Sequence, residues 1–316
     1  MAFEYFFRRP DHFGYPKFKK KGKCENSFTI PNIRQQKGNY DIFIQGDELI
    51  FPKMRKLAGL HLNNIRIPVA HCYISEQPRF DSPPKYATFL EEAGHWYVIF
   101  QHEVNSDDYE KTNSDEICGI DLGVRRFATI VTNKGQKLGQ NHSKKLVPLL
   151  SKIRHIQSKM DRSLHVNNGN KTKNYFRLHK KFRSLWKRYH NIKIDTLHKF
   201  TYELTHKFSM IAIEDLNVQE MRSKKRNMRS LSRRIANSSF YIFRELLTYK
   251  CKLYGVDLVV VDRFFPSSQL CAKCGNRKPM PLKNKVYECP VCGFHHDRDI
   301  NAAANLLKEA IRITQG

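Results

Sequence analysis

The sequence predicts a mixed α/β fold that carries a cysteine-rich insertion and follows a smaller β-rich module. Two observations predict it. After residue 116, strand-like and helix-like segments follow one another in the order strand, strand, strand, helices, strand, helix, strand, helix. Two Cys-x2-Cys pairs, beginning at Cys271 and Cys289, stand between the last expected strand and the last expected helix.

The β-rich module is expected in residues 26–104, where short β-type runs alternate with Gly, Pro and Asn turns. The polar residues 105–115 are predicted to be a linker. The expected domains are therefore 1–105 and 106–316. The strands expected in the first are Ser27–Ile30, Tyr40–Ile44, Ile65–Pro68, Tyr86–Leu90 and Trp96–Val104.

The second domain begins with three expected strands, Ile117–Val124, Phe127–Thr132 and 136–140. Apolar residues then recur at helical spacing, which predicts a pair of helices over 144–208, broken by a turn at residues 167–170. The segment 220–236 is loop-like or marginally helical. The remaining expected elements are the strand Met210–Ile213, a helix over 238–254 stopped by Gly255, the strand Asp257–Val261 and the helix Asp299–Ile313. This is the RNase H-like order of a mixed sheet.

The net charge is +26, which requires a polyanion to offset it and indicates nucleic acid. The alternative is a basic protein that is soluble but binds no nucleic acid. The clustering of the charge in 143–193 and 222–234 disfavours it. No apolar run approaches the ~18 residues of a membrane span, and 222–234 lacks the apolar face of a membrane-surface helix. The candidate nucleic-acid-binding residues are Lys144, Lys145, Arg154, Lys180, Lys181, Arg183, Lys187, Arg188, Arg222, Lys224, Lys225, Arg226, Arg229, Arg233 and Arg234. Tyr175, Trp186 and Tyr189 are candidates for base stacking, although the spacing of the last two also suits a helix core.

Three acids fall at the strand ends and helix start of the expected sheet: Asp121, Glu214 and Asp299. Carboxylates gathered there would repel one another unless cations neutralise them. Mg²⁺ suits such oxygen ligands, and two ions ~3.5–4 Å apart would support in-line attack of water on a phosphate. Asp215 is an alternative to Glu214. Asp299 could instead be a helix N-cap, with Asp297 as the ligand.

The cysteines Cys271, Cys274, Cys289 and Cys292 have the spacing of a tetrahedral zinc site. Four sulfur ligands would close the site and make the zinc structural, so His295 and His296 are not needed as ligands. The insertion is expected over 264–298. Paired cysteines in a chain without a recognisable export signal favour metal over disulfides and a reducing, cytoplasmic compartment.

Four segments resemble the TnpB family, the OrfB-type proteins of insertion sequences, which are related to compact type V CRISPR effectors. They are Gly119-Ile-Asp121-Leu-Gly-Val, Ile211-Ala-Ile-Glu214-Asp-Leu-Asn, Pro266-Ser-Ser-Gln-Leu-Cys271-Ala-Lys-Cys274-Gly and Asp297-Arg-Asp299-Ile-Asn-Ala-Ala-Ala-Asn305.

The resemblance implies an RNA-guided DNA endonuclease with a RuvC nuclease domain, whose acids are Asp121, Glu214 and Asp299. It implies one structural zinc, two catalytic Mg²⁺, guide RNA and target DNA as partners, and neither a membrane nor an organic cofactor. Residues 26–104 resemble the later part of the family's wedge domain. Residues 1–20 would be a remnant of its recognition region, so an N-terminal truncation is expected. The alternatives are a truncated, non-cleaving protein that binds DNA under RNA guidance or without sequence specificity, and a strand-transferring transposase, although the latter usually has Glu on the last helix. The expected location is the prokaryotic cytoplasm, at the nucleoid.

Overall fold

The computed structural model describes residues 7–8, 15, 26–31, 43–45, 48–50, 83–92, 94–123, 126–141, 144–216, 231–281 and 284–315, with the backbone alone at 30–31, 43–45, 48–50 and 231–238. The chain divides into two compact units, Met1–Val104 and Asn105–Gly316. Among the helices of the described part, none has the length and apolar character needed to cross a bilayer.

The first unit contains a three-stranded antiparallel sheet of β1 (Ser27–Pro31), β4 (Tyr86–Glu92) and β5 (His95–Gln101). Ala87 and Phe89 are buried on one face of β4, as expected for alternation along a strand. A short hairpin joins β2 (Phe43–Gln45) to β3 (Glu48–Ile50). The predicted strands at 27–30 and 86–90 are confirmed in position, the predicted 96–104 ends earlier, at Gln101, and the predicted 40–44 overlaps β2. Ile65–Pro68 lies outside the described residues.

The second unit is built on a five-stranded mixed sheet, which confirms the predicted mixed α/β class. Its strands are ordered β10-β9-β6-β7-β8. β6, β9 and β10 are parallel, whereas β7 pairs antiparallel with both β6 and β8. The bounds are Ile117–Leu122 for β6, Ala128–Thr132 for β7, Lys137–Gln140 for β8, Met210–Glu214 for β9 and Asp257–Val261 for β10.

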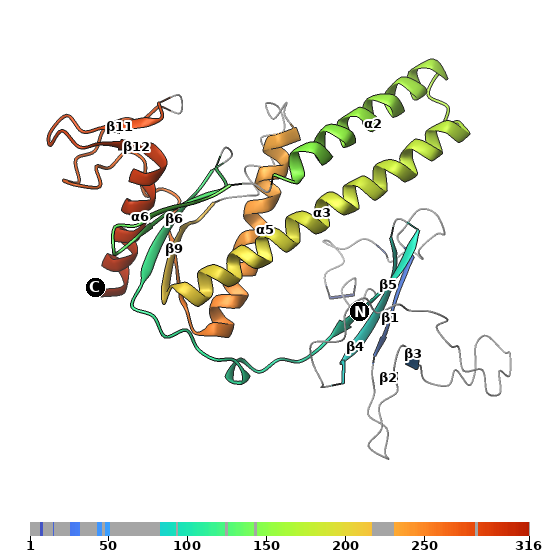
Figure 1. Cartoon of the computed structure of the whole chain (residues 1–316), viewed down its shortest axis with the longest axis horizontal. Helices are drawn as coiled ribbons and strands as arrows, with labels where there is room; N and C mark the ends of the chain where they lie inside the picture. Colours follow the sequence, from blue (N-terminus) through green and yellow to red (C-terminus); the bar gives the residue numbers. More distant parts are fainter. Residues whose placement is uncertain are drawn as a thin grey trace, which may run out of the picture. The chain divides into compact units, whose positions relative to one another are not determined.

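Helices cover both faces of this sheet (Figure 1). Strand β9 contacts helices on both faces, because its successive side chains point to opposite sides of the sheet. Ile211 and Ile213 pack with residues of α3 (Lys173–Lys207) and α5 (Leu231–Tyr254). Met210 and Ala212 pack with α6 (Arg298–Gln315). Burial on both faces explains why the central strands are continuous apolar runs rather than alternating ones.

The predicted helix pair consists of α2 (Leu146–Val166) and α3, which form an antiparallel hairpin. The chain turns where Asn168 and Gly169 take positive φ angles, and the Thr172 side chain caps α3. α5 begins at Leu231, earlier than the predicted 238, so Arg233 and Arg234 belong to the helix, which is the helical alternative for this part of 220–236. Its end at Gly255, where φ is +69°, confirms the predicted stop.

The polar segment predicted to be a linker caps two helices. Thr112 donates from its backbone N to Tyr254 O (2.9 Å) and from its hydroxyl to Thr205 O (2.5 Å). The Ser114 hydroxyl donates to Lys207 O (2.8 Å). Carbonyls in the last turn of a helix lack partners within that helix, so this segment satisfies the ends of α3 and α5.

Candidate active site and cysteine cluster

Gly119 on β6 brings the last helix unusually close to the sheet. A Cβ atom at this position would lie 2.2 Å from Ala303 O and 2.7 Å from Leu307 N. Asp299, Ala303 and Leu307 are spaced four residues apart and therefore share one face of α6. Asp121 lies two residues after Gly119 and points to the same face of the sheet. The close packing at Gly119 thus places the first turn of α6 beside Asp121.

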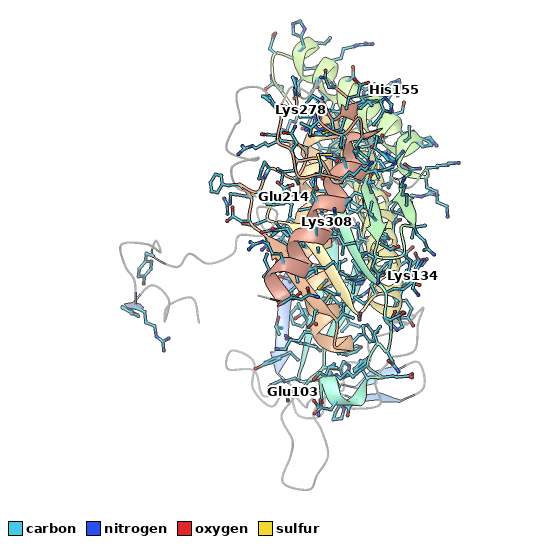
Figure 2. The ribbon with its side chains drawn as sticks, turned by 90° about the vertical axis from the view of Figure 1, so that its left-hand side faces the viewer. Glu103, Lys134, His155, Glu214, Lys278 and Lys308 are labelled. Carbon is cyan, nitrogen blue, oxygen red and sulfur yellow. The ribbon has the colours of Figure 1, made fainter. Side chains whose placement is uncertain are left out.

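Glu214 reaches the same place from the neighbouring strand. β6 and β9 run parallel with Gly119 paired to Ala212 and Ile120 paired to Ile213, so Asp121 and Glu214 are next in register. Glu214 follows Met210 and Ala212 on the face that packs against α6. Figure 2 views the molecule from the side that carries α6 and labels Glu214. We call Asp121, Glu214 and Asp299 the acid cluster.

Burial and neighbouring negative charges disfavour the charged forms of Asp121 and Glu214. Burial raises the pKa of Asp121 to about 8, assisted by the negative charges of Asp299 and Glu214, while Arg298 opposes the shift. Burial and the charge of Asp215 also raise the pKa of Glu214. A positive charge at this position would remove the repulsion, which is what divalent cations do in carboxylate sites.

Each of the two neighbouring acids is engaged elsewhere. Asp215 forms ion pairs with Arg244 on α5 and with Arg263, whose Nη2 lies 2.8 Å from Asp215 Oδ2. These partners hold the pKa of Asp215 below its usual range. Asp297 is the N-cap of α6, because its Oδ1 accepts from the backbone N of Asp299 (2.9 Å) and of Ile300 (3.2 Å). The capping role considered for Asp299 therefore belongs to Asp297.

The four predicted cysteines form a compact group, which we call the cysteine cluster. Their Sγ atoms all lie within 4.8 Å of one another, with 3.6 Å between Cys271 and Cys292 and 3.5 Å between Cys274 and Cys289. These are too long for disulfides and close to the ~3.8 Å edge of a sulfur tetrahedron around zinc at ~2.3 Å. The cluster could hold one zinc ion.

Two equivalent turns present the sulfurs. Gly275 N donates to Cys271 O (2.9 Å) and Gly293 N to Cys289 O (3.1 Å), and both glycines have positive φ. The second turn connects β11 (Val286–Glu288) to β12 (His295–Asp297). The sequence thus supplies glycine where the backbone must be left-handed.

The two histidines beside the cysteine cluster have other partners. His295 Nε2 lies 3.3 Å from Glu288 Oε1. His296 Nε2 lies 2.5 Å from Lys137 Nζ on β8, and its Nδ1 accepts from Asp297 N. Neither belongs to the group of sulfur ligands.

Two asparagines on α6 tie the cysteine cluster to the helix that carries Asp299. The Asn301 side chain accepts from Ala272 N (2.9 Å) and donates to Leu270 O (2.7 Å). The Asn305 side chain donates to Leu270 O and Ser267 O, both at 2.8 Å. Sequence reasoning missed this clamp. Its signal is the Asn-x3-Asn spacing on a helix that is otherwise apolar on that side.

The predicted basic surface is only partly described. Along the α2–α3 hairpin, Lys187 is half-buried, and the exposed members are Lys144, Lys145, Arg154, Lys180, Lys181, Arg183 and Arg188. Arg222, Lys224, Lys225, Arg226 and Arg229 lie outside the described residues, as do the side chains of Arg233 and Arg234. Tyr189 is buried and Trp186 packs beside it in the hairpin core, so neither is free to stack on a base. Tyr175 is half-buried and stacks on His179.

Two family models and several known proteins are similar to the chain. Residues 100–225 match the family model OrfB_IS605, described as "Probable transposase", and residues 240–306 match the Cas12f1-like TNB domain. The TnpB-like protein L79 of Acanthamoeba polyphaga mimivirus is 30% identical over 224 residues, covering 68% of this chain and 41% of the relative. The chain belongs to the TnpB family.

Other TnpB relatives carry endonuclease names. The "Putative RNA-guided DNA endonuclease" of Streptomyces pristinaespiralis is 31% identical over 232 residues, which is 73% of this chain and 54% of the relative. "Putative RNA-guided DNA endonuclease InsQ" of Escherichia coli K12 is 26% identical over 319 residues, covering 97% and 70%. This TnpB chain spans about half the length of the first of them.

Among solved structures, a CRISPR-Cas12f ternary complex is similar with a TM-score of 0.47 and 17% identity, over 72% of this chain and 46% of that one. A Cas12f1–sgRNA–target DNA complex is similar with a TM-score of 0.40, also at 17% identity, over 70% and 55%.

Proposed function

We propose that this chain is the nuclease part of an RNA-guided DNA endonuclease. The observation that carries the proposal is the acid cluster, in which two adjacent strands and the start of α6 direct three carboxylates to one end of one sheet face. The names of the TnpB relatives support the same substrate class. In this proposal the five-stranded sheet is an RNase H-like RuvC domain.

Asp121, Glu214 and Asp299 fit Mg²⁺, because all three offer hard carboxylate oxygens and their mutual repulsion is relieved by positive charge. When bound, two such ions supply an activated water and stabilise the leaving 3′ oxygen of a phosphodiester. The chain's own contribution is to fix the positions of the three carboxylates. Gly119 sets the separation of β6 and α6, and the Asp297 cap fixes the helix start.

The remaining parts have supporting roles in this proposal. The cysteine cluster would hold one structural zinc, since all four ligand positions are sulfur. The exposed cations of the α2–α3 hairpin would bind the phosphates of guide RNA or of the RNA–DNA duplex. Residues 26–104 would belong to a wedge domain.

Substitution of one acid tests the proposal. Asp121→Ala should reduce Mg²⁺-dependent plasmid cleavage, measured with the RNA that copurifies, by at least about a thousandfold, because it removes a ligand shared by the cluster. Binding of nucleic acid should change little. Asp195→Ala is the matched control, since Asp195 is an exposed acid on α3 paired with Lys199. Undiminished cleavage by Asp121→Ala would refute the assignment, and binding without cleavage by the parent chain would favour the non-cleaving alternative.

The description of the matching family model favours strand transfer as a second candidate. The same carboxylates would then serve attack by a 3′ hydroxyl in place of water. Covalently joined donor and target DNA would distinguish this reaction from cleavage, which leaves unjoined ends.

A further inference from the structure

Phe264 is the most exposed large apolar side chain among the described residues, with 84% of its surface accessible. It stands in the loop 262–267 between β10 and the cysteine cluster, which we call the rim loop. A single exposed apolar residue is ordinary. Two features of Phe264 are unusual: the rim loop holds it in a fixed conformation, and the loop lies next to the acid cluster.

Hydrogen bonds within the rim loop set its conformation. Asp262 Oδ1 accepts from the backbone N of Phe264 (2.7 Å), and Asp262 O accepts from Phe265 N (3.0 Å). Phe265 O accepts in turn from Ser267 N (2.8 Å). The ring of Phe264 is therefore displayed on an ordered turn, which lowers the entropic cost of binding through it.

Both ends of the rim loop are attached to the elements that carry the acid cluster. Arg263 donates to Asp215 Oδ2 (2.8 Å), next to Glu214. Ser267 O accepts from the Asn305 side chain (2.8 Å) on α6, the helix that begins with Asp299 in its first turn. The rim loop thus connects the end of β9 to α6.

Strand register places Phe264 at the same edge of the sheet as the acid cluster. Val261 is paired with Glu214 in the parallel β9–β10 ladder. Phe264 follows three residues later, within ~10 Å of extended chain. An exposed aromatic ring therefore stands at the border of a group of like-charged carboxylates.

We propose that Phe264 stacks on an unpaired base of single-stranded DNA at the entrance to the acid cluster; this subsite rests on the proposed function. The carboxylates of the acid cluster repel phosphates, so charge alone holds a DNA strand poorly at this position. Stacking supplies affinity without charge and accepts any base. The strongly basic composition of the chain favours nucleic acid over protein as the occupant.

The test uses the full chain with Asp121→Asn, a substitution that prevents cleavage of the DNA during the measurement. The ligand is single-stranded DNA carrying 2-aminopurine at successive positions. A base stacked on Phe264 should lose fluorescence on binding. Adding Phe264→Ala should abolish that quenching and weaken binding about tenfold, as expected for loss of one stacked base. Phe264→Trp should retain both, because the aromatic face remains.

Ile313→Ala is the control, because Ile313 is a 48% exposed apolar residue at the far end of α6. It should leave quenching and affinity unchanged. Equal quenching and affinity in Phe264→Ala and the parent would overturn the stacking proposal, including the case in which Phe264 contacts a protein. Fluorescence and affinity are measured without cleavage. If the parent chain, with Asp121 in place, fails to cleave DNA, the nuclease assignment is refuted but the stacking result can still be interpreted.

Discussion

The cysteine cluster and the acid cluster are two candidate metal sites built in opposite ways. The cysteines come from two adjacent turns of one short segment, and their sulfurs lie within 4.8 Å of one another. The acids come from β6, β9 and α6, which are far apart in the sequence. In the part of the chain that the structure describes, the cysteine cluster is the tighter group. Local backbone geometry builds the first site, and packing of the sheet against α6 builds the second.

This contrast predicts that the cysteine cluster depends on its ion and the acid cluster on its helix. The largest effect is expected from Cys274→Ser, which should remove about one zinc per chain and unfold the two cysteine turns, since structural zinc contributes folding energy directly. Metal analysis and hydrogen exchange of residues 271–293 would measure it. Val291→Ala, an exposed neighbour in the second turn, should keep its zinc. A parent chain that is folded and free of zinc would contradict the site.

Gly119→Ala should have the next largest effect, on the packing of α6 that builds the acid cluster. The added Cβ would meet backbone atoms of α6 at 2.2 and 2.7 Å, so α6 must shift, at a cost of roughly 3 kcal/mol in the free energy of unfolding. Denaturant titration would measure the loss, and the zinc content should stay unchanged. Gly139→Ala is the control, because its Cβ would meet the flexible Arg126 side chain at 3.1 Å. Equal stability of the two variants would show that close packing at Gly119 is unimportant.

The acid cluster should also respond to pH. Because the pKa of Asp121 is raised from 3.8 to about 8, the folded chain binds this proton more tightly than the unfolded chain. Without a divalent cation, stability should therefore fall as the pH rises between these values. Mg²⁺ must displace the proton, so its apparent affinity should rise by up to about tenfold per pH unit until about pH 8 and then level off.

Thermal melts with and without Mg²⁺ across this pH range would measure the stabilisation by the ion. Asp121→Asn cannot lose a proton, so in this variant the pH dependence should flatten. A stabilisation by Mg²⁺ that is the same at pH 5 and pH 8 would count against Asp121 as a ligand.

The smallest effect separates the two acids at the start of α6. Asp297→Ala should cost about 1 kcal/mol, the usual loss on removing an N-cap, while stabilisation by Mg²⁺ persists. Asp299→Ala should show the reverse, with little loss of stability and no response to Mg²⁺. Urea titrations of both variants with and without Mg²⁺ would compare them. The opposite pattern would make Asp297 the ligand.

Features with local causes could be predicted. The four cysteines that could hold zinc follow from their spacing, the strands from apolar runs, and the helix stop at Gly255 from the ability of glycine to adopt a positive φ angle. Features that depend on a distant partner could not. The sequence of 105–115 predicts a linker, because its role in capping α3 and α5 depends on helix carbonyls that only the fold brings beside it. Gly119 has an evident role only once Ala303 lies against it.

The sequence by itself determined that the chain carries four paired cysteines, a basic surface and acids at the ends of predicted strands. Only the tertiary structure decided which acid of each neighbouring pair faces Asp121. Adjacent residues at the end of β9 point to opposite faces, so Glu214 turns toward α6 and Asp215 toward Arg244 on α5. At the start of α6, the exposed backbone N–H groups take Asp297 as their cap. The choice depends on what lies on each side, which is a property of the assembled sheet.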